Sequence, residues 1–378
     1  MTTARTKVRF DTTDQSLQHD LKARVDAYFD YTGLPRTADA GQWAKAVFFI
    51  GGTVALLAVL ASGALPAVVA IPVAVLLGVF MAAMGFNVGH DAIHGAFSQR
   101  PWVNAVLSRT FDLCGASSFT WSTAHNFVHH TYTNVPGTDH DLDPGPFMLF
   151  SARANPPAIY RLQHIYAFAL YALTHIVWVF KKDFQQIAAP DPRSGKRAPL
   201  GKIVDVVLGK IVHLGLFIGV PLAFSGYAPW QVVLGYAIAL GAAGLTLAIV
   251  FQLAHVVEGT AFPVADDSGR IADPWAVHQL RTTANFARGH WFWTFFTGGL
   301  NHQVEHHLMY KIAHCHYPAL APIVRDVAQK HGVPYLEYPS FLAALAAHVR
   351  TMKRFGHGEA LPTTSPSLLL TIEPLPAE

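Results

Sequence analysis

Two long apolar stretches constrain the fold more than any other feature of this sequence. Residues 66–89 contain no charged side chain, and residues 44–64 contain only Lys45. About 20 consecutive apolar residues are enough for a helix to cross a hydrocarbon layer roughly 30 Å thick. The link at 62–66 reads Ser-Gly-Ala-Leu-Pro, and glycine with proline is typical of a break between helices. The two stretches therefore predict a transmembrane hairpin.

The same pattern occurs again later in the chain. Residues 203–224 and 230–255 are apolar, and the link at 225–229 reads Ser-Gly-Tyr-Ala-Pro. We therefore expect an all-α integral membrane protein with four transmembrane helices in two hairpins. Residues 164–180 are also apolar, and we interpret them as an interfacial or re-entrant helix. The alternative is a soluble all-α protein, but only 13% of residues are charged, against about 25% in soluble domains.

The basic residues predict the orientation in the membrane. The segment up to Lys45 holds seven Lys and Arg, residues 100–202 hold ten, and the two short links hold none. By the positive-inside rule, both termini and the long middle region face the cytoplasm. A net charge of only +3 gives no support to nucleic-acid binding.

These patterns divide the chain into three parts. Residues 1–41 form a cytoplasmic segment without a signal peptide, in which Leu17, Leu21, Val25 and Phe29 mark an amphipathic helix. That helix lies on the membrane surface or packs on the cytoplasmic domain. Residues 42–357 form the membrane domain, and residues 358–378, rich in Pro, Ser and Thr, are expected to be a flexible tail.

Histidines gather where the predicted spans end. His90 and His94 are four residues apart, as are His125 and His129, and as are His302 and His306, while His130 and His307 directly follow the last two pairs. The last span ends at His255. Residues four apart share a helix face, and neutral imidazole binds Fe, Zn, Cu and Ni. Because seven or eight imidazoles exceed what one ion can take, we expect a helical cap holding two metal ions.

Ligating imidazoles commonly donate their second N–H to carboxylates or carbonyls. The polar residues near the histidines are candidates for this role: Asp91, Asp139, Asp141, Asp143, Glu258, Asn301 and Glu305.

Three motifs resemble the histidine boxes of the membrane fatty acid desaturases. They are "GHDAIHGAFS", "HNFVHHTYTNVPGTDHDLDP" and "FTGGLNHQVEHHLMYKIAHCHYPALAPIV". The glutamine in the third motif and the stretch "TTANFARGHWFW" at 282–293 are similar to the front-end branch of that family. Members of the family usually have Phe-Pro after the third box, whereas this chain has Met309-Tyr310.

The resemblance implies a non-haem centre of two iron ions that uses O₂ to introduce a double bond into a fatty acyl chain. The implied ligands are His90, His94, His125, His129, His130, His255, Gln303, His306 and His307. His302 is a rival to Gln303, because imidazole is the better iron ligand. The sequence contains no His-Pro-Gly-Gly haem motif, so we expect the electrons to come from a separate ferredoxin or small cytochrome.

Other functions remain open at this stage. A hydroxylase, ketolase or acetylenase of the same superfamily would use the same histidines. From another class, a haem-binding or metal-carrying membrane protein would hold its ligands inside the bilayer rather than at the helix ends.

Overall fold

The protein, described from a computed structural model, is mostly helical over residues 8–360, the part of the chain that the structure describes. Its α-helices are α1 (Ser16–Thr32), α2 (Ala40–Ala61), α3 (Ala67–Met84), α4 (His90–Ile93), α5 (Pro101–Leu113), α6 (Ser118–Thr123), α7 (His130–Tyr132), α8 (Gln163–Val177), α9 (Asp183–Ala188), α10 (Leu200–Leu214), α11 (Val220–Phe224), α12 (Pro229–His255), α13 (Trp275–Thr282), α14 (Trp291–Phe296), α15 (Gln303–Met309), α16 (Tyr317–Lys330) and α17 (Phe341–Gly356). The expected tail lies outside the described residues from 361 onward.

Short irregular turns and two small sheets complete the fold. The π-helical turns are η1 (Gly85–Gly89), η2 (Ala124–His129), η5 (Trp178–Lys182) and η6 (Gly215–Gly219), and the 3₁₀ turns are η3 (His140–Leu142), η4 (Ala158–Leu162) and η7 (His314–His316). Strand β1 (Arg9–Phe10) pairs in parallel with β2 (Arg270–Ile271), and β3 (Ala284–Phe286) pairs in parallel with β4 (Leu336–Tyr338).

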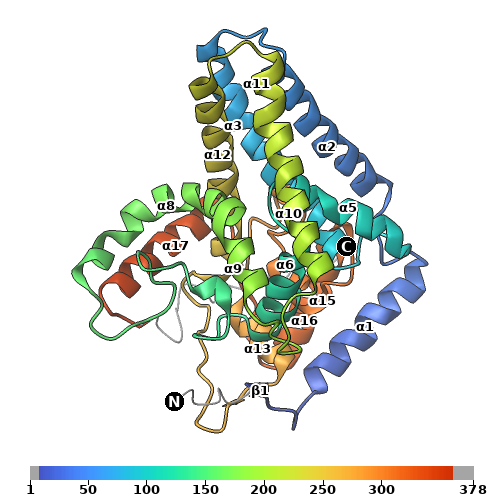
Figure 1. Ribbon diagram of the computed structural model, residues 1–378. Coiled ribbons are helices and arrows are strands. Elements are labelled where there is room, and N and C mark those ends of the chain that lie inside the picture. The colour runs from blue at the N-terminus through green and yellow to red at the C-terminus, as the bar shows by residue number, and fades with distance from the viewer. Residues whose placement is uncertain (1–7, 361–378) are drawn as a thin grey trace.

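Two helical hairpins form the long bundle in the upper part of Figure 1. Helix α2 turns into α3, and α10 continues through η6 and α11 before turning into α12. Helices α3 and α12 pack so closely at Gly78 that a Cβ atom added there would lie only 2.0 Å from the carbonyl oxygen of Ala239. The bundle thus brings His90, at the start of α4 after α3 and η1, and His255, at the end of α12, to the same end of the molecule.

Within the described residues, five helices are long and apolar enough to cross a membrane. They are Ala40–Ala61, Ala67–Ile93, Ala158–Ala188, Leu200–Phe224 and Pro229–His255. Four of them match the predicted spans, and the chain is an integral membrane protein. The fifth contains the stretch at 164–180, for which we expected an interfacial or re-entrant helix. It is the least apolar of the five, and Figure 1 shows α8 running across the end of the bundle rather than along it.

The remaining helices form a compact cap at the histidine end of the bundle. Helix α1 buries Leu17, Leu21, Val25 and Phe29 in a cluster with residues of α13 and α16. Of the two placements considered for this amphipathic helix, the structure has the one in which it packs on the cap. The cap also contains α4 to α7 and α15, so all three histidine motifs lie in or beside it (Figure 1).

Candidate metal centre

Eight histidines from four separate segments converge under the bundle, and each is buried. His90 and His94 follow α3, the motif at 125–130 occupies η2 and α7, His306 and His307 lie on α15, and His255 is the last residue of α12. The π-helical turn η2 bonds each residue to the fifth along, a geometry often found at functional sites. It brings Nε2 of His125 to 3.1 Å from Nε2 of His130.

The imidazoles fall into two groups. In the first, His90, His94, His125 and His306 each offer a nitrogen, and these nitrogens all lie within 4.8 Å of one another. In the second, His129, His255 and His307 do the same. His130 lies between the groups, with its ring centroid 4.6 Å from that of His306 and 4.4 Å from that of His307. The arrangement offers two adjacent sites of the size that a transition-metal ion needs.

The nitrogens of these groups fit metal ions because many of them are buried without a hydrogen-bond partner. Among the described residues, both ring nitrogens of His94 and Nε2 of His255, His306 and His307 have no partner. Nε2 of His125 has only other imidazoles beside it, at 3.2 Å from Nε2 of His90 and 3.1 Å from Nε2 of His130. Buried polar atoms are normally hydrogen bonded, so imidazole nitrogens gathered in this way are costly unless cations occupy the space between them. The residues are therefore suited to bind metal.

The pKa values of these side chains agree with a ligand role. Burial, and then the neighbouring imidazoles, lower the pKa of His125, His130, His306 and His307 well below its usual value. Their rings are therefore neutral, which is the form that coordinates metal.

Four of the histidines are oriented through Nδ1. The Nδ1–H group of His129 donates to Asp139 Oδ2 at 3.0 Å, that of His307 to Gln279 Oε1 at 2.9 Å, and that of His255 to the carbonyl of Thr282 at 3.4 Å. Nδ1 of His306 is hydrogen bonded to the Tyr317 hydroxyl at 3.1 Å. Such bonds fix the tautomer and leave Nε2 free for the metal. Burial would lower the pKa of His129, but Asp139 outweighs this effect and the pKa is raised.

Of the seven polar residues predicted to orient the ligating histidines, three lie beside these imidazoles and four do not. Oδ1 of Asp91 lies 3.7 Å from Nδ1 of His90, and Oδ2 of Asp141 lies 3.6 Å from Nδ1 of His129. Both carboxylates therefore lie beside the imidazoles, as that of Asp139 does. The other four make different contacts: Asp143 accepts from Gly145, Glu258 pairs with Arg350, Asn301 bonds to Thr294 and Thr297, and Glu305 accepts from Asn285 and Tyr335.

The side chains of Gln303 and His302 point to different surroundings. The Nε2 atom of His302 lies 3.5 Å from the Thr294 hydroxyl, and its Nδ1 lies 3.8 Å from Glu305. His302 belongs to neither imidazole group. Gln303 is buried at the start of α15, and its side-chain Nε2 has no partner.

Sequence reasoning missed several residues that contact the imidazoles. Gln279 and Tyr317 orient His307 and His306, and the Thr133 hydroxyl lies 3.2 Å from His307 Nδ1. The indole of Trp121 stacks on His125 with ring centroids 4.5 Å apart. Gln279 lies outside the three motifs and 28 residues from the histidine that it orients, so no spacing rule singles it out. Tyr317 lies within the third motif, eleven residues after His306, and its phenol gave no signal of a role beside a metal ligand.

Another missed group surrounds Asp91. Its Oδ2 accepts from Nδ1 of His314 at 2.9 Å and from Nε2 of Gln42 at 2.7 Å. These bonds tie α4 to α2 and to η7. They hold the carboxylate in place beside His90.

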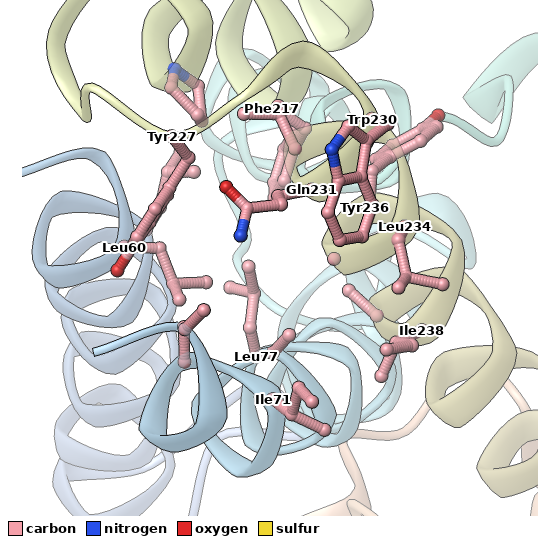
Figure 2. Close-up of a pocket in the computed structure, with 18 of the residues that line it drawn as sticks. Leu60, Ile71, Leu77, Phe217, Tyr227, Trp230, Gln231, Leu234, Tyr236 and Ile238 are labelled. Carbon is pink, nitrogen blue, oxygen red and sulfur yellow. The ribbon is translucent and has the colours of Figure 1, made fainter. Parts of the chain in front are cut away.

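Two cavities follow α3 upward from the imidazoles. A small one of about 20 Å³ is lined by His90, Trp121 and Phe251, among others. A larger apolar one of about 340 Å³ lies further along the bundle, and Figure 2 shows Leu77, Phe217 and Tyr236 among the side chains around it. Tyr236, which lines the larger cavity, is hydrogen bonded through its hydroxyl to Nε2 of His213 at 2.7 Å.

The long apolar helices indicate a membrane protein, and the two groups of buried imidazoles at their ends indicate that it binds metal. Comparison with known sequences narrows this class. The family described as "Fatty acid desaturase" matches residues 64–339. An sn-1 linoleoyl-lipid 6-desaturase of Synechocystis sp. is 38% identical over 93% of this chain and 98% of its own length.

Two further relatives support the same assignment. An sn-1 linoleoyl-lipid 6-desaturase of Arthrospira platensis is 30% identical over 94% of this chain and 96% of its own length. An acyl-lipid (8-3)-desaturase of Physcomitrium patens is 31% identical over 89% of this chain and 71% of its own length. The chain therefore belongs to the fatty acid desaturase family.

Proposed function

We propose that this chain is a membrane fatty acyl desaturase that uses O₂ and two external electrons to introduce a double bond into a lipid-linked acyl chain. The observation that carries the proposal is the pair of buried imidazole groups with unpartnered nitrogens. The named relatives support the substrate class, and the two 6-desaturases favour a linoleoyl chain as substrate.

Two iron ions are the proposed occupants of the imidazole groups. His90, His94, His125 and His306 would hold one ion, and His129, His255 and His307 the other, with His130 able to reach either. We assign Gln303 rather than His302 as the additional ligand, because the His302 ring is directed to Thr294 and Glu305. Asp141 is a further candidate, since one of its oxygens lies close to nitrogens of His125 and His129.

The bound irons would supply the strong oxidant that an unactivated C–H bond requires. The protein's own residues do the positioning. Asp139 and Gln279 hold His129 and His307 in the tautomer that presents Nε2, and Tyr317 orients the ring of His306. Trp121 and Phe251 wall off the space beside His90 with apolar rings. Placement of the acyl carbon to within about an ångström matters, because small misplacements lower the rate strongly.

The acyl tail is proposed to follow α3 from the imidazoles into the bundle. The two cavities support this path, since Met81 lines the small cavity and Leu77, one helical turn away, lines the large one. The Tyr236–His213 hydrogen bond lies where the tail would pass from the first to the second. These side chains would then limit how deep the methyl end reaches.

For the topology, we propose four transmembrane helices, with α8 lying at the interface. Both termini and the cap would face the cytoplasm, as the basic residues indicate. Residues 1–41 would form the N-terminal segment, 42–357 the membrane domain and 358–378 the tail. Electrons would come from a separate ferredoxin or small cytochrome, which is the partner that the reaction needs.

Product analysis in a host lacking such an activity tests the proposal. Cells expressing the chain are fed labelled linoleic acid, and their lipids are analysed by mass spectrometry with the double-bond positions mapped. A product two hydrogens lighter supports desaturation, and His129→Ala should abolish it. His19→Ala is the matched control, because His19 is exposed on α1. A product carrying added oxygen would favour a hydroxylase or ketolase instead, and a triple bond an acetylenase.

A further inference from the structure

The stretch from the end of η5 through α9 to the first turn of α10 carries an unusual density of positive charge. Residues 181–202 contain six Lys and Arg and two Asp. We call the six basic residues the basic face: Lys181, Lys182, Arg193, Lys196, Arg197 and Lys202. All except the half-buried Lys182 are exposed. Of the two aspartates, Asp183 is buried against Lys210, and Asp191 pairs with Arg193. The surface is thus strongly positive.

The basic face surrounds α6, the helix that leads into the second histidine motif. Arg193 Nη2 donates to the hydroxyl of Thr123 at 3.3 Å, and Lys202 Nζ lies 5.3 Å from the ring centroid of Phe119. Lys182 lies 3.6 Å from Asp141, which in turn sits beside His129. Figure 1 shows α9 and the first turns of α10 beside α6. The charge is therefore close to the metal centre.

A short stack of aromatic rings joins this surface to the imidazoles. Lys182 Nζ lies 5.1 Å from the ring centroid of Trp178. Trp178 stacks on Trp121 with centroids 4.9 Å apart, and Trp121 stacks on His125 with centroids 4.5 Å apart. Electron tunnelling slows steeply with distance, so consecutive π contacts of this kind favour transfer along the stack.

Resting on the proposed function, we infer that the basic face is the docking surface for an acidic one-electron carrier protein, and that electrons enter through Trp178 and Trp121 to His125. The acyl chain loses two hydrogens, and O₂ takes these together with two protons and two electrons to form two waters. Two reduced carriers dock in turn, each losing one electron. Opposite charges on the two proteins speed and orient this encounter.

The test uses the full chain in nanodiscs of uncharged phosphatidylcholine, with an acidic two-iron, two-sulfur ferredoxin as the donor. One variant reverses three exposed charges without a side-chain partner in the structure: Lys181→Glu, Lys196→Glu and Arg197→Glu. The control variant makes the same charge change elsewhere on the surface: Arg153→Glu, Arg161→Glu and Lys353→Glu. Turnover is also measured with dithionite, a small reductant that needs no docking.

We expect the first variant to raise KM for ferredoxin at least about tenfold at low salt, with kcat and dithionite-driven turnover unchanged. The control variant should leave KM unchanged. An unaltered KM in the first variant, or an equal rise in both, would overturn the inference. So would an effect seen only in discs containing anionic phosphatidylglycerol, which would assign the basic face to lipid headgroups. Absence of product from the unmodified chain even with dithionite would instead refute the proposed function.

The stack is tested separately with Trp178→Leu, using Trp178→Phe to restore an aromatic ring. Because Trp178 also lines the small cavity beside His90, the readout is the ratio of ferredoxin-driven to dithionite-driven kcat. This ratio should fall about tenfold in the leucine variant and recover in the phenylalanine variant. A parallel fall with both reductants would mean that Trp178 only supports the fold, and it would overturn the proposed route.

Discussion

Replacing Asp139 by asparagine should weaken metal binding at the second imidazole group. The carboxylate accepts three hydrogen bonds in the structure. Oδ2 accepts from His129 Nδ1 at 3.0 Å and from the backbone N–H of Asn134 at 2.9 Å, and Oδ1 accepts from the backbone N–H of Asp141 at 3.0 Å. An amide keeps only one acceptor oxygen, so its NH₂ group must face at least one of these donors.

The loss of iron affinity in Asp139→Asn should match the energy of the hydrogen bond that it removes. A hydrogen bond to a charged acceptor contributes about 1.5–3 kcal/mol. Loss of a residue that orients a ligating histidine typically costs about 10–100-fold in metal affinity, which corresponds to about 1.4–2.7 kcal/mol. The two ranges agree, so we expect the affinity of the second imidazole group for iron to fall about 10–100-fold.

Chelator competition measures this change directly. The purified chain, loaded with ferrous iron without oxygen, is titrated with a chelator, and the iron retained is quantified. The matched control is Asp143→Asn, since Asp143 is exposed and its carboxylate accepts only from Gly145 among the hydrogen bonds of the described residues. Iron retention by Asp139→Asn equal to that of the unmodified chain would refute the reasoning, as would an equal loss in the control.

Three further predictions concern positions other than Asp139 and Asp143. Gln303→Ala should lower the iron content while His302→Ala keeps it, measured by elemental analysis; the reverse outcome would make His302 the ligand. Gly78→Ala should destabilise the fold by about 1–3 kcal/mol through overpacking of α3 against α12. Gly85→Ala has open space around its Cβ position and should change stability by no more than about 1 kcal/mol. Thermal unfolding in detergent compares the two variants, and equal effects would contradict the packing argument. Lys210→Met should cost about 3–5 kcal/mol, because it leaves the buried carboxylate of Asp183 without its counter-charge. An unchanged melting temperature would show that the ion pair contributes nothing.

The long apolar helices were predictable because their signal is local. The uncharged run at 66–89 and the proline at Pro229 set the limits of α3 and α12 to within a few residues, and the span lengths put His90 and His255 at the same end. The stretch at 164–180 was harder, because its length suits either a span or an interfacial helix, and only packing against neighbouring helices chooses between them.

The candidate site was partly predictable for a similar reason. Asp139 was accessible to sequence reasoning because it lies ten residues from the histidine that it orients. Gln279 and His314 act on residues far away in the chain, so only the folded structure brings them into view. The π-helical turn η2 also went unforeseen. Spacing rules for α-helices pair His125 with the fourth residue along, whereas this turn also brings His130 to it.

Metal analysis of the purified chain tests the central claim most directly. The chain is loaded with ferrous iron under anaerobic conditions, desalted, and analysed for iron and protein. Two imidazole groups predict two tightly held irons per chain, and a loss of iron in His129→Ala and in His90→Ala. A preparation that binds no stoichiometric transition metal, or one whose iron content is unchanged by both substitutions, would contradict the account.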